Sequence, residues 1–186
     1  MKYFKLLFII IACANIFAAC KKDKTEPTEL SKLPAATQIG AKTFGCLVNG
    51  IAFVPDNGCT FLCTPAFRAN YDNSNGGFFY INAELINSDQ NIDKHINFGL
   101  DSCINNRLYN MSTLPKITMS YFDYKMPSST CQTFFSSDIN VIRSGYVNLT
   151  KCDFGTGIIS GMFEFKIERN GCETINITNG RFDAKL

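Results

Sequence analysis

The sequence predicts an all-β domain: an antiparallel β-sandwich or, as the alternative, a partly closed β-barrel. Short segments alternate apolar and polar residues, with the period of two that a half-buried strand requires. Residues that favour turns, Asn-Gly pairs above all, separate these segments at short intervals, as in sandwiches and barrels. From residue 43 onward no segment keeps a helical period for three turns. The 186 residues suit one such domain.

The first predicted element is a β-hairpin. The apolar segments 44–48 and 51–54 flank Asn49-Gly50. Asn-Gly is the strongest short hairpin signal because both residues tolerate a positive φ. A loop rich in Asn, Ser and Gly follows over residues 72–77.

The middle of the chain predicts further strands. Residues 79–85, 96–100 and 117–121 alternate apolar and polar side chains, which predicts strands with one buried face. Between residues 127 and 140, Ser, Thr and Phe occur without a clear period. This stretch predicts a long loop with an edge strand.

The last segment, 145–186, predicts an antiparallel meander. Turn residues at 153–157 and at Asn170-Gly171 separate three alternating segments. We expect the side chains that face the core to include Phe163, Phe165, Ile175, Ile177 and Phe182.

Residues 1–19 predict a lipoprotein signal peptide. Lys2 and Lys5 precede a short apolar run that ends in small residues just before Cys20, which is the layout of a secretory signal peptide. The run is shorter than the roughly 20 apolar residues that span a bilayer. Small residues directly before a cysteine are typical of the bacterial lipobox, so we expect Cys20 to carry the lipid that anchors the protein. An ordinary signal peptide with a coincidental cysteine is the alternative.

Residues 20–42 predict the lipidated cysteine and a flexible tether, ahead of a single β domain at 43–186. The tether is polar, contains Pro27 and Pro34, and follows neither hydrophobic period. As a flexible coil it would reach on the order of 25 Å from the membrane.

The charge balance argues against a nucleic-acid partner. The chain has 18 Lys and Arg against 16 Asp and Glu, and the two signs become equal once Lys2 and Lys5 leave with the signal peptide. Nucleic-acid binding needs a basic surface to neutralise phosphates, and the sequence has no basic cluster beyond residues 21–24. The expected partner is the membrane, through the N-terminal lipid.

Seven of the nine cysteines lie in the predicted domain. The candidate disulfide cysteines are Cys46, Cys59, Cys63, Cys103, Cys131, Cys152 and Cys172. Disulfides persist in exported proteins, and an odd number leaves at least one thiol unpaired within the chain. A zinc site at Cys59-x-x-x-Cys63 is the alternative, but it would need a second closely spaced ligand pair, which does not follow.

Two of these cysteines are predicted not to pair with each other. Cys152 and Cys172 lie at opposite ends of one predicted strand, roughly 30 Å apart. A disulfide needs Cα atoms about 4.4–6.8 Å apart. Cys59 and Cys63 can form a bridge only if the chain turns between them.

No catalytic residue, metal site or cofactor is predicted. His95 is the only histidine and lies on the outward side of its segment. Acid–base catalysis would need carboxylates held across a cleft, and nothing in the sequence brings Glu84, Asp101 and Asp123 together. The loop that begins at Asp72 resembles the start of a calcium loop, but it lacks the bidentate glutamate at position twelve.

Two stretches carry a family resemblance. TFGCLVNG at residues 43–50 is one, and IISGMFEF at 158–165 with ITNGRFD at 177–183 is the other. Together they resemble uncharacterised lipoproteins of Bacteroidota that are grouped as a domain of unknown function. The resemblance implies a mostly-β lipoprotein of the outer membrane, facing the periplasm or the surface, and it assigns no catalytic residues.

These observations predict a lipid-anchored lipoprotein of the cell envelope, held to the outer membrane in a leaflet that the sequence leaves open. The predicted activity is that of a non-catalytic binding or interaction module of unknown ligand. A protein and a glycan are both open as partners. The alternative is an envelope hydrolase that uses carboxylates on loops.

Overall fold

A computed structural model of the chain describes residues 27–186 except 60–61, 75–76, 112–116 and 136. The strands of sheet A are β1 (Thr43–Val48), β2 (Ile51–Phe53), β6 (Arg107–Asn110), β9 (Val141–Asp153), β10 (Ile158–Arg169) and β11 (Ile175–Lys185). The strands of sheet B are β3 (Phe67–Asp72), β4 (Phe78–Asn87), β5 (Ile92–Asp101), β7 (Ile117–Asp123) and β8 (Thr133–Phe135). Two short 3-10 helices are η2 (Glu29–Lys32) and η4 (Ser129–Cys131).

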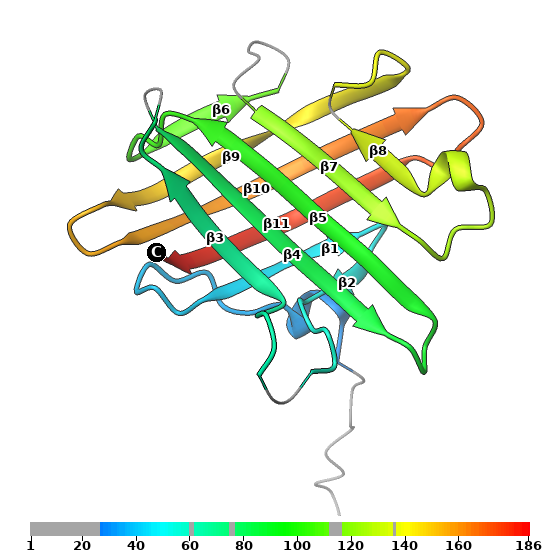
Figure 1. Cartoon of the computed structure of the whole chain (residues 1–186), viewed down its shortest axis with the longest axis horizontal. Coiled ribbons are helices and arrows are strands. Elements are labelled where there is room, and N and C mark those ends of the chain that lie inside the picture. Colours follow the sequence, from blue (N-terminus) through cyan, green and yellow to red (C-terminus); the bar gives the residue numbers. More distant parts are fainter. Residues whose placement is uncertain (1–26, 60–61, 75–76, 112–116, 136) are drawn as a thin grey trace, which may run out of the picture.

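The described strands form two antiparallel sheets packed face to face, which confirms the predicted β-sandwich. Sheet A has the order β2-β1-β11-β10-β9-β6, and sheet B has the order β3-β4-β5-β7-β8. In Figure 1 the strands of sheet B cross in front of those of sheet A, in a second layer. The two sheets remain separate in the described residues and do not close into the alternative barrel.

Phenylalanine rings fill the space between the two sheets. The ring of Phe98 on β5 lies 5.0 Å from Phe163 on β10 and 5.8 Å from Phe182 on β11, measured between centroids. Phe163 in turn lies 5.1 Å from Phe44 on β1. The five side chains predicted to face the core in the C-terminal meander are all buried. A buried aromatic ring contributes a large apolar area, so these contacts define the core.

A β-bulge in β11 changes which positions face inward. Ile177 pairs with Phe165, but the next paired residue on β11 is Gly180, opposite Phe163. Asn179 takes up the extra length with a φ of +54°. The inward side chains are therefore odd-numbered before the bulge and even-numbered after it, where Phe182 faces the core.

The first hairpin has the predicted turn. β1 and β2 pair through Val48 and Ile51, and the two turn residues have positive φ angles, +48° at Asn49 and +83° at Gly50. This is the geometry that favours Asn-Gly in two-residue hairpins. The predicted edge strand after residue 127 is β8, which pairs with β7 at the border of sheet B.

Residues 27–42, predicted as part of a flexible tether, are instead packed on the domain. Glu29 in η2 accepts a hydrogen bond from the Ala52 backbone N–H at 2.8 Å, and Leu33 is 8% exposed. Further along, Thr37 Oγ1 donates to the Asp183 carboxylate at 2.6 Å. Contacts with distant elements, those of Glu29 with Ala52 and of Thr37 with Asp183, hold this segment, rather than a hydrophobic period. Residues 20–26 lie outside the described residues.

Two disulfides connect elements that are far apart in the sequence. Cys103 pairs with Cys152, with Cα atoms 6.4 Å apart, and Cys131 pairs with Cys172 at 5.6 Å. Cys152 and Cys172 therefore do not pair with each other.

The remaining cysteines of the domain differ in their environment. Cys59 and Cys63 form a third disulfide, with Cα atoms 6.0 Å apart. Leu62 between them has a φ of +55°, as expected where the chain turns. Cys46 on β1 is the free cysteine of the described residues and is buried.

Candidate functional site

The outer face of sheet B carries the most distinctive set of side chains on the described surface. Because β4, β5 and β7 place their apolar residues inward, every second side chain points to solvent. Figure 1 looks onto this sheet, which is the nearer of the two layers. The outward positions at the centre of the sheet hold amides, hydroxyls and aromatic rings, and Arg68 and Glu84 form an ion pair toward the β3 edge.

Five outward residues form one straight row across all five strands. Arg68 on β3 lies opposite Asn82 on β4, and Asn82 lies opposite Asn97 on β5. Asn97 lies opposite Ser120 on β7, and Ser120 lies opposite Phe135 on β8. Neighbouring strands are about 4.8 Å apart, so a side chain on one strand can reach the polar group of the side chain opposite it and form a hydrogen bond.

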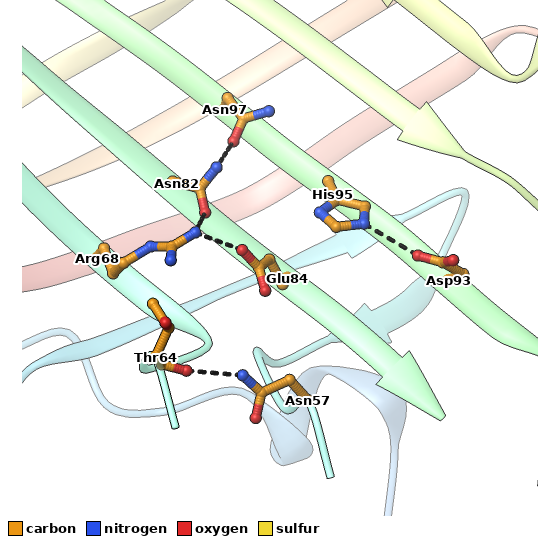
Figure 2. A network of polar contacts seen from close by, with 8 residues as sticks. All are labelled: Asn57, Thr64, Arg68, Asn82, Glu84, Asp93, His95 and Asn97. Atoms are coloured by element: carbon orange, nitrogen blue, oxygen red, sulfur yellow. Dashed lines mark hydrogen bonds and ion pairs between the residues drawn. The ribbon is translucent and has the colours of Figure 1, made fainter. Parts of the chain in front are cut away.

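Hydrogen bonds connect this row in a single direction (Figure 2). Arg68 Nη2 donates to Asn82 Oδ1 at 2.5 Å, and Asn82 Nδ2 donates to Asn97 Oδ1. Asn97 Nδ2 then donates to Ser120 Oγ at 3.1 Å. A guanidinium has only donors, so Arg68 fixes the oxygen of Asn82 toward itself. Each following amide is oriented in turn. We call the four hydrogen-bonded residues, Arg68, Asn82, Asn97 and Ser120, the amide row.

Glu84 holds the first residue of the row in place. Its carboxylate forms an ion pair with Arg68 Nη2 on the neighbouring strand, and both side chains are partly buried, 17% and 34% exposed. Figure 2 shows Arg68 between Glu84 and Asn82. The guanidinium is therefore neutralised within the protein.

A hollow of about 540 Å³ lies along the amide row. Its outward-facing lining residues are Phe78, Tyr80, Asn82, Asn97, Gly99, Thr118, Ser120, Phe135 and Ser137. None of these described residues carries a charge. The volume lies within the range of small-molecule sites, about 300–1,000 Å³.

Gly99 forms the floor of the hollow. The ring of Phe78 lies over this residue, and a Cβ built there would meet the ring and lie 2.9 Å from Thr118 Oγ1. A side chain at position 99 would therefore require the Phe78 ring to move. Phe78 and Tyr80 are stacked, with centroids 6.3 Å apart, and Tyr80 is 41% exposed.

A second aromatic group lies on the other side of the amide row. Phe122 on β7 is 5.8 Å from Tyr124 and 5.3 Å from Phe135, between ring centroids. His95, opposite Phe122 on β5, lies edge-on to it at 6.2 Å. His95 and Gly99 are four residues apart along β5, so the level of Phe122 and the level of Tyr80 are roughly 13 Å apart along the strand direction.

The carboxylates considered for acid–base catalysis lie in three different places. Glu84 points outward and is paired with Arg68. Asp123 is buried on the inner face, with Lys94 Nζ 3.2 Å from its Oδ2. Asp101 is the last residue of β5. It lies six residues beyond His95, the residue opposite Glu84, which is a separation of roughly 20 Å along the strand. His95 points outward as predicted, and its Nε2 lies 2.9 Å from Asp93 Oδ1.

The other predicted site residues are not part of this face. Cys46 lies in the core, where burial raises the pKa of its thiol. Asp72 accepts a hydrogen bond from the Ser74 N–H at 2.8 Å within its own loop. Among the described residues no group of three or more His, Cys, Asp and Glu side chains could hold a metal ion. Cys20 and the predicted signal peptide lie outside the described residues.

The β3 edge of the face borders the loop closed by Cys59 and Cys63. Asn57 Nδ2 donates to the Thr64 carbonyl at 2.8 Å across the base of this loop, as Figure 2 shows below Arg68. The disulfide and this hydrogen bond restrict the loop beside the amide row.

Comparison of the chain with protein-family models, with characterised proteins and with solved structures gives no match. In the described part of the chain, no helix has the length and apolar character needed to cross a membrane.

The amide row was not found by sequence reasoning. The alternation of β4 and β5 predicts that Asn82 and Asn97 point outward, but it does not show that they are neighbours. Only the strand register places them opposite each other. A useful signal was present, because Asn is disfavoured in strands and both outward asparagines lie at strand centres.

Proposed function

We propose that this protein is a lipid-anchored lipoprotein of the cell envelope that acts as a non-catalytic binding module, with its ligand site on the outer face of sheet B. The observation that carries the proposal is the hydrogen-bonded amide row, oriented by Arg68 and lying along an uncharged hollow with aromatic walls. Binding sites have this combination of a largely apolar surface with a few polar groups held in fixed positions.

The proposed anchor is Cys20, in the outer membrane. The signal-peptide pattern and the lipobox support it, as does the resemblance to envelope lipoproteins. Pro27 is the first described residue, and Glu29 already contacts β2 through the Ala52 N–H. The intervening residues 21–26 can span at most roughly 25 Å even when fully extended, so the anchor would keep the domain close to the membrane surface.

A catalytic role has weaker support than binding. Hydrolysis by paired carboxylates requires two groups across one cleft, and Glu84, Asp101 and Asp123 are dispersed over both faces and both ends of sheet B. The described lining residues of the hollow can orient a ligand, and they include no carboxylate, histidine or thiol.

Site-specific photocrosslinking in the intact envelope tests the binding face. A photoreactive phenylalanine analogue replaces Tyr80 in one variant and Met162 in the matched control, since Met162 is similarly exposed, at 44%, on the outer face of sheet A. We expect an adduct at position 80 that is lost when Asn97→Ala is added, and none at position 162. Equal adducts at both positions, or none at position 80, would refute the proposed face.

The anchor is tested separately by mass spectrometry and fractionation. The membrane form should begin at Cys20 with added acyl mass, and Cys20→Ser should leave the membrane fraction. An unmodified Cys20 in membrane-bound protein would contradict the proposed lipidation.

A further inference from the structure

The hydrogen bonds within the amide row leave further donors of its side chains available. Each amide nitrogen has two N–H bonds, and Asn82 and Asn97 each use one of them within the row. Ser120 Oγ accepts from Asn97, so its own proton is available to a ligand. The row therefore presents donors and acceptors together, at the strand spacing of about 4.8 Å.

These groups match a ligand that donates and accepts at neighbouring positions. A hydroxyl group does both, with one donor and two acceptor lone pairs. An anionic ligand would need a cation, but the hollow is uncharged and Arg68 is already paired with Glu84. An acyl chain would cover the amides without replacing their bonds to water, which is unfavourable.

The aromatic rings on both sides of the row match the apolar faces of sugar rings. Tyr80 stacks on Phe78 and stays 41% exposed, so a flat ring with an apolar face can pack against it. The second group, around Phe122, lies two strands away and at least roughly 13 Å further along the strand direction. This distance is longer than one sugar ring, so a ligand that contacts both groups is an oligosaccharide.

We propose that the hollow on sheet B binds a neutral oligosaccharide segment of a polysaccharide, stacking a sugar ring on Tyr80 and Phe78 and hydrogen-bonding sugar hydroxyls to Asn82, Asn97 and Ser120. This inference rests on the proposed function, because it names the ligand class of the same face. Gly99 helps to place the Phe78 ring, because a Cβ at position 99 would collide with that ring.

Calorimetry with defined oligosaccharides tests the inference. The mature lipoprotein, kept in a detergent without sugar groups, is titrated with cellohexaose, xylohexaose, mannohexaose and maltohexaose, and with trigalacturonate as a charged comparison. We expect at least one neutral hexasaccharide to bind. Tyr80→Ala and Asn97→Ala should each lower its association constant about tenfold, because each removes a stacking surface or a central pair of hydrogen bonds.

Two controls separate binding from folding. Met162→Ala on the outer face of sheet A should leave the affinity unchanged, and urea unfolding should show that Tyr80→Ala and Asn97→Ala are folded under the conditions of the titration. Binding to none of the four hexasaccharides, or equal binding of trigalacturonate, would overturn the inference. The photocrosslinking experiment then distinguishes the two proposals. If no hexasaccharide binds but a protein is crosslinked at position 80 in the envelope, the binding face is correct and the ligand class is wrong. If no hexasaccharide binds and nothing is crosslinked at position 80, both proposals are wrong.

Discussion

Asp183 connects the N-terminal segment to sheet A, and replacing it with Asn should destabilise the protein strongly. Its carboxylate is 1% exposed. Oδ2 accepts from Thr37 Oγ1 at 2.6 Å and from the backbone N–H groups of Ile39 and Ala41 at 3.0 and 3.1 Å. Oδ1 accepts from the Gly40 N–H at 2.9 Å and from Ser160 Oγ at 2.7 Å.

The magnitude follows from the pKa of this carboxyl. Burial raises the pKa of Asp183, but hydrogen bonds from Thr37, Ala41, Ser160 and Ile39 outweigh burial and lower it from 3.8 to about 2. The difference corresponds to about 2.5 kcal/mol in favour of the charged form. In Asp183→Asn an amide NH₂ would face some of these donors and leave them unsatisfied, so we expect a loss of about 3 kcal/mol in the free energy of unfolding.

The pH dependence gives an independent measurement of the same contribution. Because the pKa is lower in the folded state, the stabilisation is fully present above about pH 5 and declines as the pH falls toward 2. The wild-type protein and Asp183→Asn should therefore differ most near neutral pH, and their difference should shrink near pH 2.

Urea unfolding and amide hydrogen exchange measure the effect. Exchange should increase at Ile39, Gly40 and Ala41, whose N–H groups lose their acceptor. Asp153→Asn is the matched control, because Asp153 accepts from Thr156 in an exposed turn and its loss should cost less. If Asp183→Asn unfolds at the same urea concentration as wild type, with unchanged exchange at these amides, the reasoning is wrong.

Three further predictions concern the core and the cysteines. Phe163→Ala should cost about 3–5 kcal/mol by emptying a buried aromatic site, whereas the outward neighbour variant Met162→Ala should change stability little in the same urea titration; equal effects would contradict the strand phase. Cys131→Ala removes the disulfide to Cys172, which closes a loop with a sequence separation of 41, and should cost about 4 kcal/mol; a loss under about 1 kcal/mol would contradict a stabilising bridge. Cys46, whose thiol pKa is raised by burial, should react with iodoacetamide only in denaturant, and rapid labelling of the folded protein would show that the thiol is accessible.

Local patterns predicted much of the fold. The alternation in β4, β5, β7 and β10 identified which side chains face inward, since a strand has a side-chain period of two whatever its partner. Asn49-Gly50 predicted the first hairpin, because its turn geometry depends on those two residues alone. The exclusion of a Cys152–Cys172 bridge needed only the length of one strand.

Contacts between distant segments could not be predicted in this way. Residues 27–42 lack a hydrophobic period, and they pack on the domain through contacts with Ala52 and with Asp183, far along the chain. The two long-range disulfides depend on how strands pair across the sandwich. In each case the partner lies on an element whose position is set by the whole sheet order.

The candidate site shows the same division. The sequence by itself determined that Asn82, Asn97 and Ser120 are outward residues on three separate strands. Only the tertiary structure placed them in one row with Arg68 at its end, because register depends on the turns, bulges and core packing of both sheets together. The hydrogen bonds that orient the amides exist only once that register is formed.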